Sequence, residues 1–413
     1  MIHTFPWERS HTQLRIVSAG VVPGQRVYRS SEPRRRIRDR MVREQRRLNL
    51  VDIAKMAGVS RSTVSRVLND DPKVSDGVRA RVRKVLTETR FHPNAAARSL
   101  ATHRSGIIGL VFPRVFTMMF TDPWASVLIR GCLEGSERAD LSLVHMLVST
   151  DDQASVDRFF ERSVMGRHLD GVVLASHVLG DKLVSRLRES DFPYVLVGRD
   201  EHRTANFVDI DNRQAARVAT QHLIDHGYRN IMHMSGPPDL VTALDRQEGF
   251  FDAIRSAGIA PESVRVECAY FEQVTAYEVA LRILQQPDRP DAIFAADDAM
   301  AIGAIQAARE LGVHVPGDLA IIGFDDIDMN RMLRPHLTTV RQPSDALGRA
   351  AVGMLSHLIS NPSPDPTQQW LSAELIVRGS CGCSFSNSHA SGQTRRKEEQ
   401  PFDRGPGELL AQT

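Results

Sequence analysis

Residues 51–69 read VDIAKMAGVSRSTVSRVLN, and this stretch predicts two short helices joined by a tight turn. Asn49 can cap the first helix, with Asp52 reaching back to it as in a capping box. Gly58 is expected to end that helix, because glycine adopts the left-handed conformation of a helix C-terminus at little cost. Ser60 can then cap a second helix over 61–68. The pattern is that of a helix-turn-helix, in which the second helix enters the major groove of DNA.

The outer face of this second helix is polar and is expected to meet base edges and phosphates. The side chains expected to do so are Arg61, Ser62, Thr63, Ser65 and Arg66. A third helix is expected to start at Ser75, with apolar residues at helical spacing behind it.

The charge of the chain supports a polyanionic partner for this end. The net charge of the 413 residues is only +2, with 52 Lys+Arg and 50 Asp+Glu. Residues 1–101 nevertheless hold 22 Lys+Arg and 9 Asp+Glu, a net of +13, and the remainder carries a net of −11. A basic front on an acidic body indicates DNA at the N-terminal end, and a solvated basic tail is the other interpretation.

The first 46 residues differ from the rest and are expected to be disordered. The segment from Arg26 to Arg47 contains ten Arg against three acidic residues. Two explanations stay open: the stretch precedes the real start at Met41, or it is a basic arm that adds nonspecific DNA affinity.

From residue 107 onward, short apolar strands alternate with amphipathic helices. This alternation predicts an α/β fold with parallel sheets covered on both faces, and its length suits two doubly wound subdomains. The chain turns polar after residue 383, so residues 384–413 are expected to be a disordered tail. The expected strands are Ile107–Phe112, Leu141–Met146, Gly171–Leu174, Tyr194–Val197, Ile231–Met234, Val264–Ala269, Ala292–Ala295 and Leu319–Phe324.

Residues 51–69, with FHPNAAARSLA at 91–101, strongly resemble the DNA-binding domain and hinge helix of the lactose/galactose repressor (LacI/GalR) family. The resemblance implies that Asn94, Ala97 and Leu100 contact DNA, with Leu100 wedged into the minor groove at the operator centre. Such a wedge unstacks neighbouring bases, and the extra contacts made by the bent DNA offset the free-energy cost of unstacking. A helix this short is not stable alone, so it is expected to form only when two copies pair on DNA.

The remaining chain to about residue 383 resembles the effector-binding core of the same family, itself similar to periplasmic sugar-binding proteins. The matching stretches are HLIDHGY at 222–228, SGPPDL at 235–240, RQEGF at 246–250, FAADDAMAIG at 294–303 and PGDLAIIGFDD at 316–326. The implied domains are a helix-turn-helix domain (47–92), a hinge and linker (93–106) and the core (107–383). Within the core, the N-subdomain comprises about 107–210 and 341–357, and the C-subdomain about 211–340 and 358–383.

The resemblance also implies a ligand cleft between the subdomains. Arg246 offers a planar fork of donors to hydroxyls or a carboxylate, and Asp325 can accept hydroxyl hydrogen bonds at the carboxyl end of a strand. The full implied set is Trp124, Arg246, Phe271, Asp297 and Asp325. Two departures from the family pattern favour a polyol, an amino sugar or another ligand with extra donors. Asp297 stands where Asn is usual, and Ala125 replaces an aromatic residue.

No cofactor motif, nucleophile motif or metal motif is apparent. Cys381-Gly-Cys383 lacks companion Cys or His at the spacing of a zinc site, so we interpret it as an unstructured terminus and predict no metal site. His222 and His226 are the one His-x-x-x-His pair, and we expect His222 to pack in the core. Four scattered Cys fit a reducing cytoplasm rather than a disulfide scaffold.

The sequence therefore predicts a cytoplasmic transcriptional regulator, most simply a repressor, that binds a pseudo-palindromic operator in double-stranded DNA. A small effector, a sugar or related metabolite, is expected to modulate it. A homodimer is favoured, because the tail lacks the leucine heptads that tetramerise some relatives. A sugar-processing enzyme and a periplasmic solute-binding protein are the alternatives. No acid/base or nucleophile constellation in the sequence supports the enzyme. The lack of a secretory signal and the N-terminal helix-turn-helix argue against the periplasmic protein.

Overall fold

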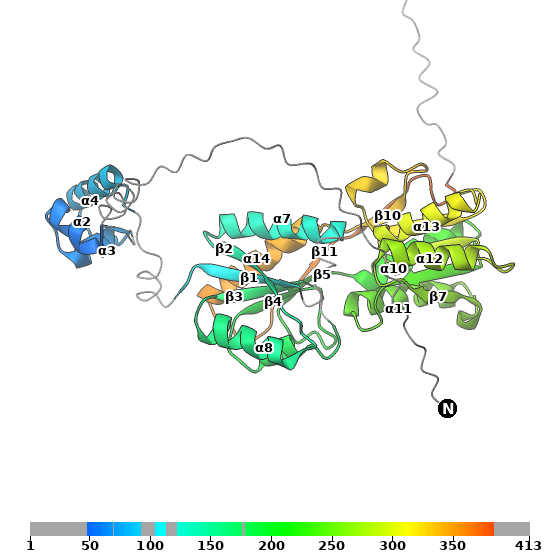
Figure 1. Ribbon diagram of the computed structural model, residues 1–413, viewed down its shortest axis with the longest axis horizontal. Helices are drawn as coiled ribbons and strands as arrows, with labels where there is room; N and C mark the ends of the chain where they lie inside the picture. The colour runs from blue at the N-terminus through cyan, green and yellow to red at the C-terminus, as the bar shows by residue number, and fades with distance from the viewer. Residues whose placement is uncertain (1–47, 69, 92–103, 113–121, 176–177, 384–413) are drawn as a thin grey trace, which may run out of the picture. The chain divides into compact units, whose positions relative to one another are not determined.

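The computed structural model describes residues 48–68, 70–91, 104–112, 122–175 and 178–383 (Figure 1). The chain divides into two compact units, Met1–Pro93 and Asn94–Thr413, and each is described by itself. The predictions for the basic stretch 1–46, for Asn94, Ala97 and Leu100, and for the tail 384–413 lie outside the described residues.

The described part of the first unit is a cluster of three helices: α2 (Leu50–Ala57), α3 (Arg61–Leu68) and α4 (Asp76–Thr89). The predicted caps are confirmed. Asn49 and Asp52 form a reciprocal capping box, Gly58 adopts a left-handed φ of 63°, and Ser60 Oγ accepts a hydrogen bond from Thr63 N at 3.1 Å. Ile53, Val64 and Val82, one from each helix, are completely buried and hold the three helices together.

Within the described residues, the second unit contains two six-stranded sheets. Each sheet and the helices that cover it form a lobe, which we call the first lobe and the second lobe. The first sheet has the order β11-β5-β4-β3-β1-β2 and the second the order β12-β10-β9-β8-β6-β7. Neighbouring strands are parallel except β12, which is antiparallel to β10. The strands are β1 (Ile107–Phe112), β2 (Ser142–Leu147), β3 (Gly171–Ala175), β4 (Tyr194–Val197), β5 (Phe207–Ile210), β6 (Ile231–Ser235), β7 (Arg265–Cys268), β8 (Ala292–Ala295), β9 (Ala320–Asp325), β10 (Thr338–Arg341), β11 (Gln368–Leu371) and β12 (Glu374–Ile376).

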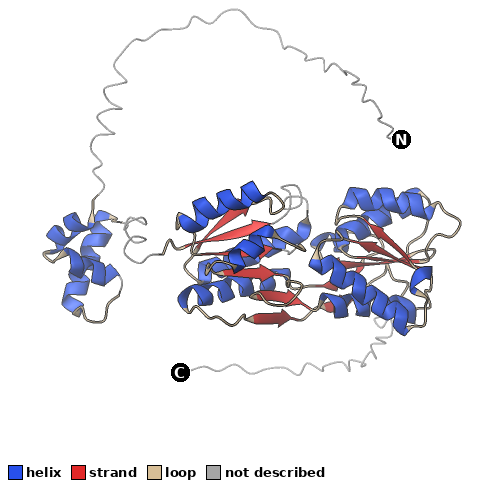
Figure 2. Cartoon of the chain, turned by 90° about the horizontal axis from the view of Figure 1, so that it is seen from below, coloured by secondary structure: helices blue, strands red, loops and turns tan. Residues whose placement is uncertain are grey.

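Helices cover both faces of each sheet (Figure 2). In the first lobe they are α7 (Pro123–Arg138) and α14 (Ser344–Ser360) on one face, and α8 (Gln153–Phe159) and α9 (Lys182–Arg188) on the other. A π-helix, Phe160–Met165, continues α8. In the second lobe they are α10 (Asn212–Asp225) and α11 (Val241–Ser256) on one face, and α12 (Gln273–Leu284) and α13 (Asp298–Glu310) on the other. The predicted doubly wound α/β architecture is confirmed.

The chain crosses between the lobes three times, after β5, after β10 and between β11 and β12. The expectation that residues of about 358–383 belong to the C-terminal subdomain is wrong for part of this segment, because β11 pairs with β5 at the edge of the first sheet. The indole of Trp370 on β11 packs edge-on against Phe207, with ring centroids 5.1 Å apart. Residues 368–371 read QQWL, so no apolar run marks this strand.

The end of the folded chain also differs from the expectation. The interpretation of Cys381-Gly-Cys383 as an unstructured terminus is wrong, since Cys381 is completely buried. The preceding Ser380 anchors the segment: its Oγ accepts from Thr338 N at 2.8 Å and donates to the Ile321 carbonyl at 2.6 Å. Among the described helices, none has the length and apolarity that a membrane crossing requires.

Candidate functional site

The exposed face of α3 is the first candidate site. Val64 and Val67 turn inward and are buried, which directs the polar positions outward. Arg61, Ser62 and Arg66 are exposed, and Thr63 and Ser65 are half-buried. The five residues predicted to enter the major groove therefore share one short helix, as the motif requires.

Charge around α3 is distributed unevenly. Arg66 lies 3.8 Å from a carboxylate oxygen of Asp71, and Asp70 accepts from both Arg79 and Arg83. Arg61 forms no ion pair with any residue that the structure describes. Its guanidinium, at the start of the helix, is therefore available to a base edge or a phosphate.

The second candidate site is a pocket in the second unit, between its two lobes. Residues from the carboxyl ends of strands in both sheets line it, which is where doubly wound sheets bind ligands. Its empty volume is about 880 Å³, which includes solvent at the open mouth. Its lining residues are Phe112, Asp122, Trp124, Ala125, Ala175, Val197, Gly198, Asp209, Asn212, Leu240, Thr242, Arg246, Phe271, Asp297, Asp325, Gln342 and Leu347.

The buried Arg246 on α11 is the only cation among these lining residues. Its Nε donates to Asn212 Oδ1 at 2.9 Å and its Nη1 to the Ala296 carbonyl at 2.5 Å. The guanidinium stacks on the ring of Phe324, with Cζ 3.6 Å from the centroid. Burial lowers the pKa of Arg246, but an arginine side chain stays charged in proteins. These contacts fix the fork of donors in place before any ligand arrives.

Four carboxyl groups surround this single guanidinium. Burial raises the pKa of Asp122 to about 6, of Asp209 to about 7 and of Asp297 to about 8. Burial also raises the pKa of Asp325 well above its ordinary value, and the charge of Arg246, 3.9 Å away, offsets only part of that rise. A low-dielectric site cannot hold all four as carboxylates beside one cation. Some of them are therefore protonated at neutral pH and offer hydroxyl donors to a ligand.

Asp297 shows this most clearly. It caps α13 by accepting from Met300 N at 2.7 Å through Oδ1. Burial, followed by repulsion from Asp122, raises its pKa to about 8, so the neutral form predominates at pH 7. A neutral carboxyl group provides one donor beside its acceptor, and the asparagine that is usual at this position likewise has both kinds of group, with two donor hydrogens. The departure from the family pattern therefore changes polarity less than a formal charge count suggests.

Aromatic groups complete the lining. Trp124 follows the cap of α7, where Asp122 Oδ1 accepts from Trp124 N at 2.8 Å. The buried indole Nε1 of Trp124 has no hydrogen-bond partner among the described residues. The ring of Phe271 approaches Gly236 so closely that a Cβ there would lie 2.3 Å from Phe271 Cζ. Only glycine at 236 leaves room for this ring.

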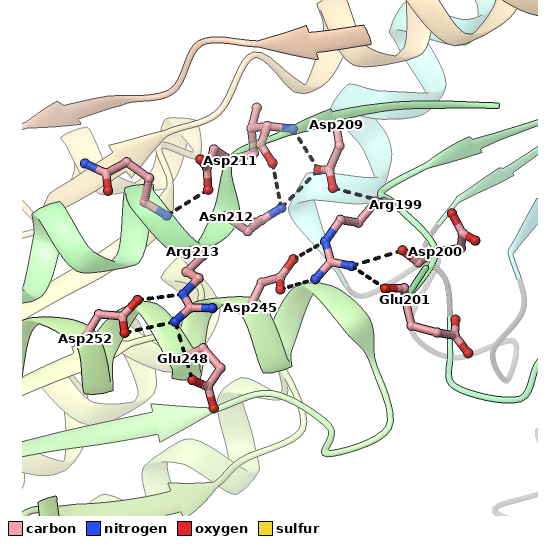
Figure 3. Close-up of polar contacts among 12 residues, drawn as sticks. Arg199, Asp200, Glu201, Asp209, Asp211, Asn212, Arg213, Asp245, Glu248 and Asp252 are labelled. Carbon is pink, nitrogen blue, oxygen red and sulfur yellow. Dashed lines mark hydrogen bonds and ion pairs between the residues drawn. The ribbon is translucent and has the colours of Figure 1, made fainter. Parts of the chain in front are cut away.

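A layer of ion pairs and hydrogen bonds supports the pocket from outside (Figure 3). Arg199 follows β4 of the first lobe, and Asp245 lies on α11 of the second lobe. Arg199 Nε donates to Asp245 Oδ2 at 2.9 Å and Arg199 Nη2 donates to Asp245 Oδ1 at 2.5 Å. Asp209 accepts from Arg199 N at 3.0 Å and from Asn212 Nδ2 at 3.0 Å. The bidentate pair thus ties the two lobes beside a pocket residue.

All five residues predicted for the ligand cleft line this one pocket: Trp124, Arg246, Phe271, Asp297 and Asp325. Sequence reasoning missed Asp122, Asp209, Asn212, Thr242 and Gln342, which also line it. Asp209 and Asn212 flank the first crossing between the lobes and Gln342 the second, where Gln342 Nε2 donates to Asp325 Oδ1 at 2.5 Å. A polar cluster directly after the strand 207–210 was the available signal.

Comparison with known proteins covers most of the chain. Residues 49–94 match the family described as "Bacterial regulatory proteins, lacI family", and residues 220–381 match "Periplasmic binding protein-like domain". The HTH-type transcriptional regulator CelR of Thermobifida fusca is 32% identical over 339 residues, covering 81% of this chain and 98% of CelR. The ribose operon repressor of Escherichia coli (strain K12) is 33% identical over 335 residues, covering 80% and 98%.

Solved structures agree. A complex of transcriptional regulator CelR with cellobiose aligns with a TM-score of 0.63 and 30% identity over 81% of this chain and all of that chain. The Lac repressor dimer bound to operator and an anti-inducer aligns with a TM-score of 0.71 and 24% identity over 81% and 99%. The similarity to the Lac repressor, at 24% identity, shows a shared fold.

Proposed function

The chain belongs to the LacI family of bacterial regulatory proteins, and from this membership we propose a repressor whose operator affinity is set by a small ligand in the inter-lobe pocket. It is a transcriptional regulator by family. The observation that carries the ligand proposal is the set of four buried carboxyl groups around Arg246 in a single pocket.

The ligand that suits this pocket is a sugar or a closely related polyol. Carboxyl groups and a guanidinium accept from and donate to hydroxyls, and Trp124 and Phe271 offer apolar faces to a sugar ring. The excess of acids over bases also favours a ligand that carries an amine. CelR was solved with cellobiose, and another relative is a repressor of a ribose operon, which supports a carbohydrate.

The DNA partner is double-stranded and is bound through α3. We assign base and phosphate contacts to Arg61, Ser62, Thr63, Ser65 and Arg66, and minor-groove contacts to Asn94, Ala97 and Leu100. A pseudo-palindromic operator and a homodimer belong to this proposal, because a two-fold protein reads two related half-sites. The Lac repressor, which shares the fold, was solved as a dimer on its operator.

Communication between the two sites follows from linkage. A ligand shifts the DNA-binding equilibrium only by its differential affinity for two arrangements of the lobes. The three crossings and the Arg199–Asp245 pair connect the lobes, so they must adjust when the lobes move relative to each other. We place the protein in the cytoplasm with its DNA, and we propose that it catalyses no reaction on its ligand.

A thermal-shift screen of the full chain against sugars, polyols and amino sugars tests the proposal. A ligand that raises the melting temperature should also change operator affinity in a gel shift and should be recovered unaltered. Arg246→Ala should abolish the melting shift, whereas Arg213→Ala, at an exposed Arg213–Asp252 pair, should keep it. Turnover of the ligand, or a melting shift that survives Arg246→Ala, would contradict this assignment of the pocket.

A further inference from the structure

Two cysteines and two histidines, far apart in the sequence, meet at the C-terminal end of α10. Cys381 Sγ and Cys383 Sγ lie 3.0 Å apart, and His222 Nε2 lies 3.4 Å from the first and 3.3 Å from the second. His226 Nε2 lies 3.0 Å from Cys383 Sγ. The cysteines are free thiols. The ligand atoms of His222, Cys381 and Cys383 all lie within 4.8 Å of one another, and that of His226 adjoins Cys383.

The hydrogen bonding of His226 suits a metal ligand. Its Nδ1 lies 2.7 Å from the His222 carbonyl, which can only accept, so Nδ1 carries the hydrogen. In the neutral imidazole the lone pair is then on Nε2, and it is this atom that faces Cys383. A backbone carbonyl that holds the far nitrogen of a histidine is the usual outer contact of a metal-binding imidazole.

The local backbone brings the two thiols together. Gly382, between them, has a φ of 84°, and a Cβ there would lie 2.6 Å from the Tyr228 hydroxyl. A side chain at this position would be strained and would collide. Ser380 fixes the start of the turn by its hydrogen bonds to Thr338 and Ile321. The turn is thus built to point both sulfurs back at α10.

The donor set selects the metal. Two thiolates and two imidazoles are the ligands of tetrahedral Cys₂His₂ zinc sites, and carboxylate-preferring cations such as Mg²⁺ or Ca²⁺ do not suit them. In a tetrahedron with bonds of about 2.3 Å to sulfur and about 2.0 Å to nitrogen, neighbouring ligand atoms lie roughly 3.3–3.8 Å apart. Cys381, Cys383 and His222 lie 3.0–3.4 Å from one another, so small outward movements of these three would accommodate the ion. His226, 3.0 Å from Cys383, would turn toward the ion as the fourth ligand.

We propose that His222, His226, Cys381 and Cys383 bind a structural zinc ion that fastens the end of the folded chain to α10. Cys381 is completely buried and Cys383 and His222 are half-buried, so three ligands lie at the margin of the core while the exposed His226 closes the site. The four protein ligands leave no open position for substrate, as in structural rather than catalytic zinc sites.

The test uses the tag-free, full-length chain purified under reducing conditions. Elemental analysis should find about one zinc per chain, and exchange for Co²⁺ should give the intense visible bands of tetrahedral cobalt with a thiolate charge-transfer band. Removing the metal with a chelator should lower the melting temperature, and adding Zn²⁺ alone should restore it.

Matched variants separate this site from adventitious binding. Cys383→Ser and His226→Gln should each weaken zinc binding by about 100-fold or more, since even outer contacts of a metal site are worth 10–100-fold. Cys268→Ser and His314→Gln, which remove a thiol and an imidazole elsewhere, should leave it unchanged. His226 is exposed, so its replacement does not disturb the core. Equal zinc binding by all four variants, or a reduced full-length protein that takes up no zinc, would overturn the proposal.

Discussion

Replacement of Asp297 by asparagine should make the second unit less sensitive to alkaline pH. The pKa of Asp297 rises from an ordinary 3.8 to about 8 in the folded protein, first because it is buried and second because Asp122 is close. Between these values the folded state binds more protons than the unfolded state, so stability falls as pH rises. Between pH 6 and pH 8, the ionisation of Asp297 should lower the free energy of unfolding by about 2 kcal/mol, at about 1.4 kcal/mol per unit of pKa.

The measurement is equilibrium urea unfolding of ligand-free protein at pH 6 and pH 8, followed by the fluorescence of Trp124 and Trp370. The amide oxygen of the variant would keep the hydrogen bond that Met300 N donates. The free energy of unfolding of Asp297→Asn should therefore fall by about 2 kcal/mol less than that of wild type between pH 6 and pH 8. The other buried acids are present in both proteins and largely cancel. Asp365→Asn, at an exposed site, is the control. Parallel pH dependence of wild type and Asp297→Asn would refute the reasoning.

Three further predictions concern the division of labour along the chain. Asp325→Ala should bind the operator normally without ligand but lose the ligand's effect, because its ligand affinity should fall by about 1–3 kcal/mol. Calorimetry measures the ligand affinity and gel shifts measure operator binding. Loss of DNA binding with intact ligand affinity would contradict the pocket assignment. Arg61→Ala should cost about 1–3 kcal/mol at one operator position per half-site; uniform weakening across sequences would instead indicate a phosphate contact. A chain starting at Met41 should bind its operator almost unchanged if the first 40 residues are dispensable, whereas phosphate contacts by the arginines would show as a salt slope flatter by about one unit per contact.

The features that could be predicted from the sequence are those whose determinants lie within a few residues of one another. The capping box of Asn49 and Asp52 and the left-handed Gly58 are such determinants, and the first two helices follow from them. Short strands with mixed composition, such as β11, escaped prediction because only pairing with β5 makes them strands. The resemblance located five pocket residues.

The remaining site features depend on contacts distant in sequence. Asp209 and Gln342 reach the pocket from two different crossings between the lobes. Cys383 meets His226, and the pair is separated by 157 positions. Spacing rules for metal sites examine neighbours along the chain, so they do not detect a site that the fold assembles from a helix end and a late turn.

The place of β11 in the first sheet has a consequence for synthesis on the ribosome. The edge of β5 is complete at Ile210, but the strand that covers it begins at Gln368, after all but the last strand of the second lobe. At about 5–20 residues per second, the edge stays open for roughly 8–30 s. During that interval Phe207 lacks the indole of Trp370, and an unpaired strand edge can recruit a neighbouring chain. Translation speed across the second lobe and chaperone supply should therefore govern the yield of native protein.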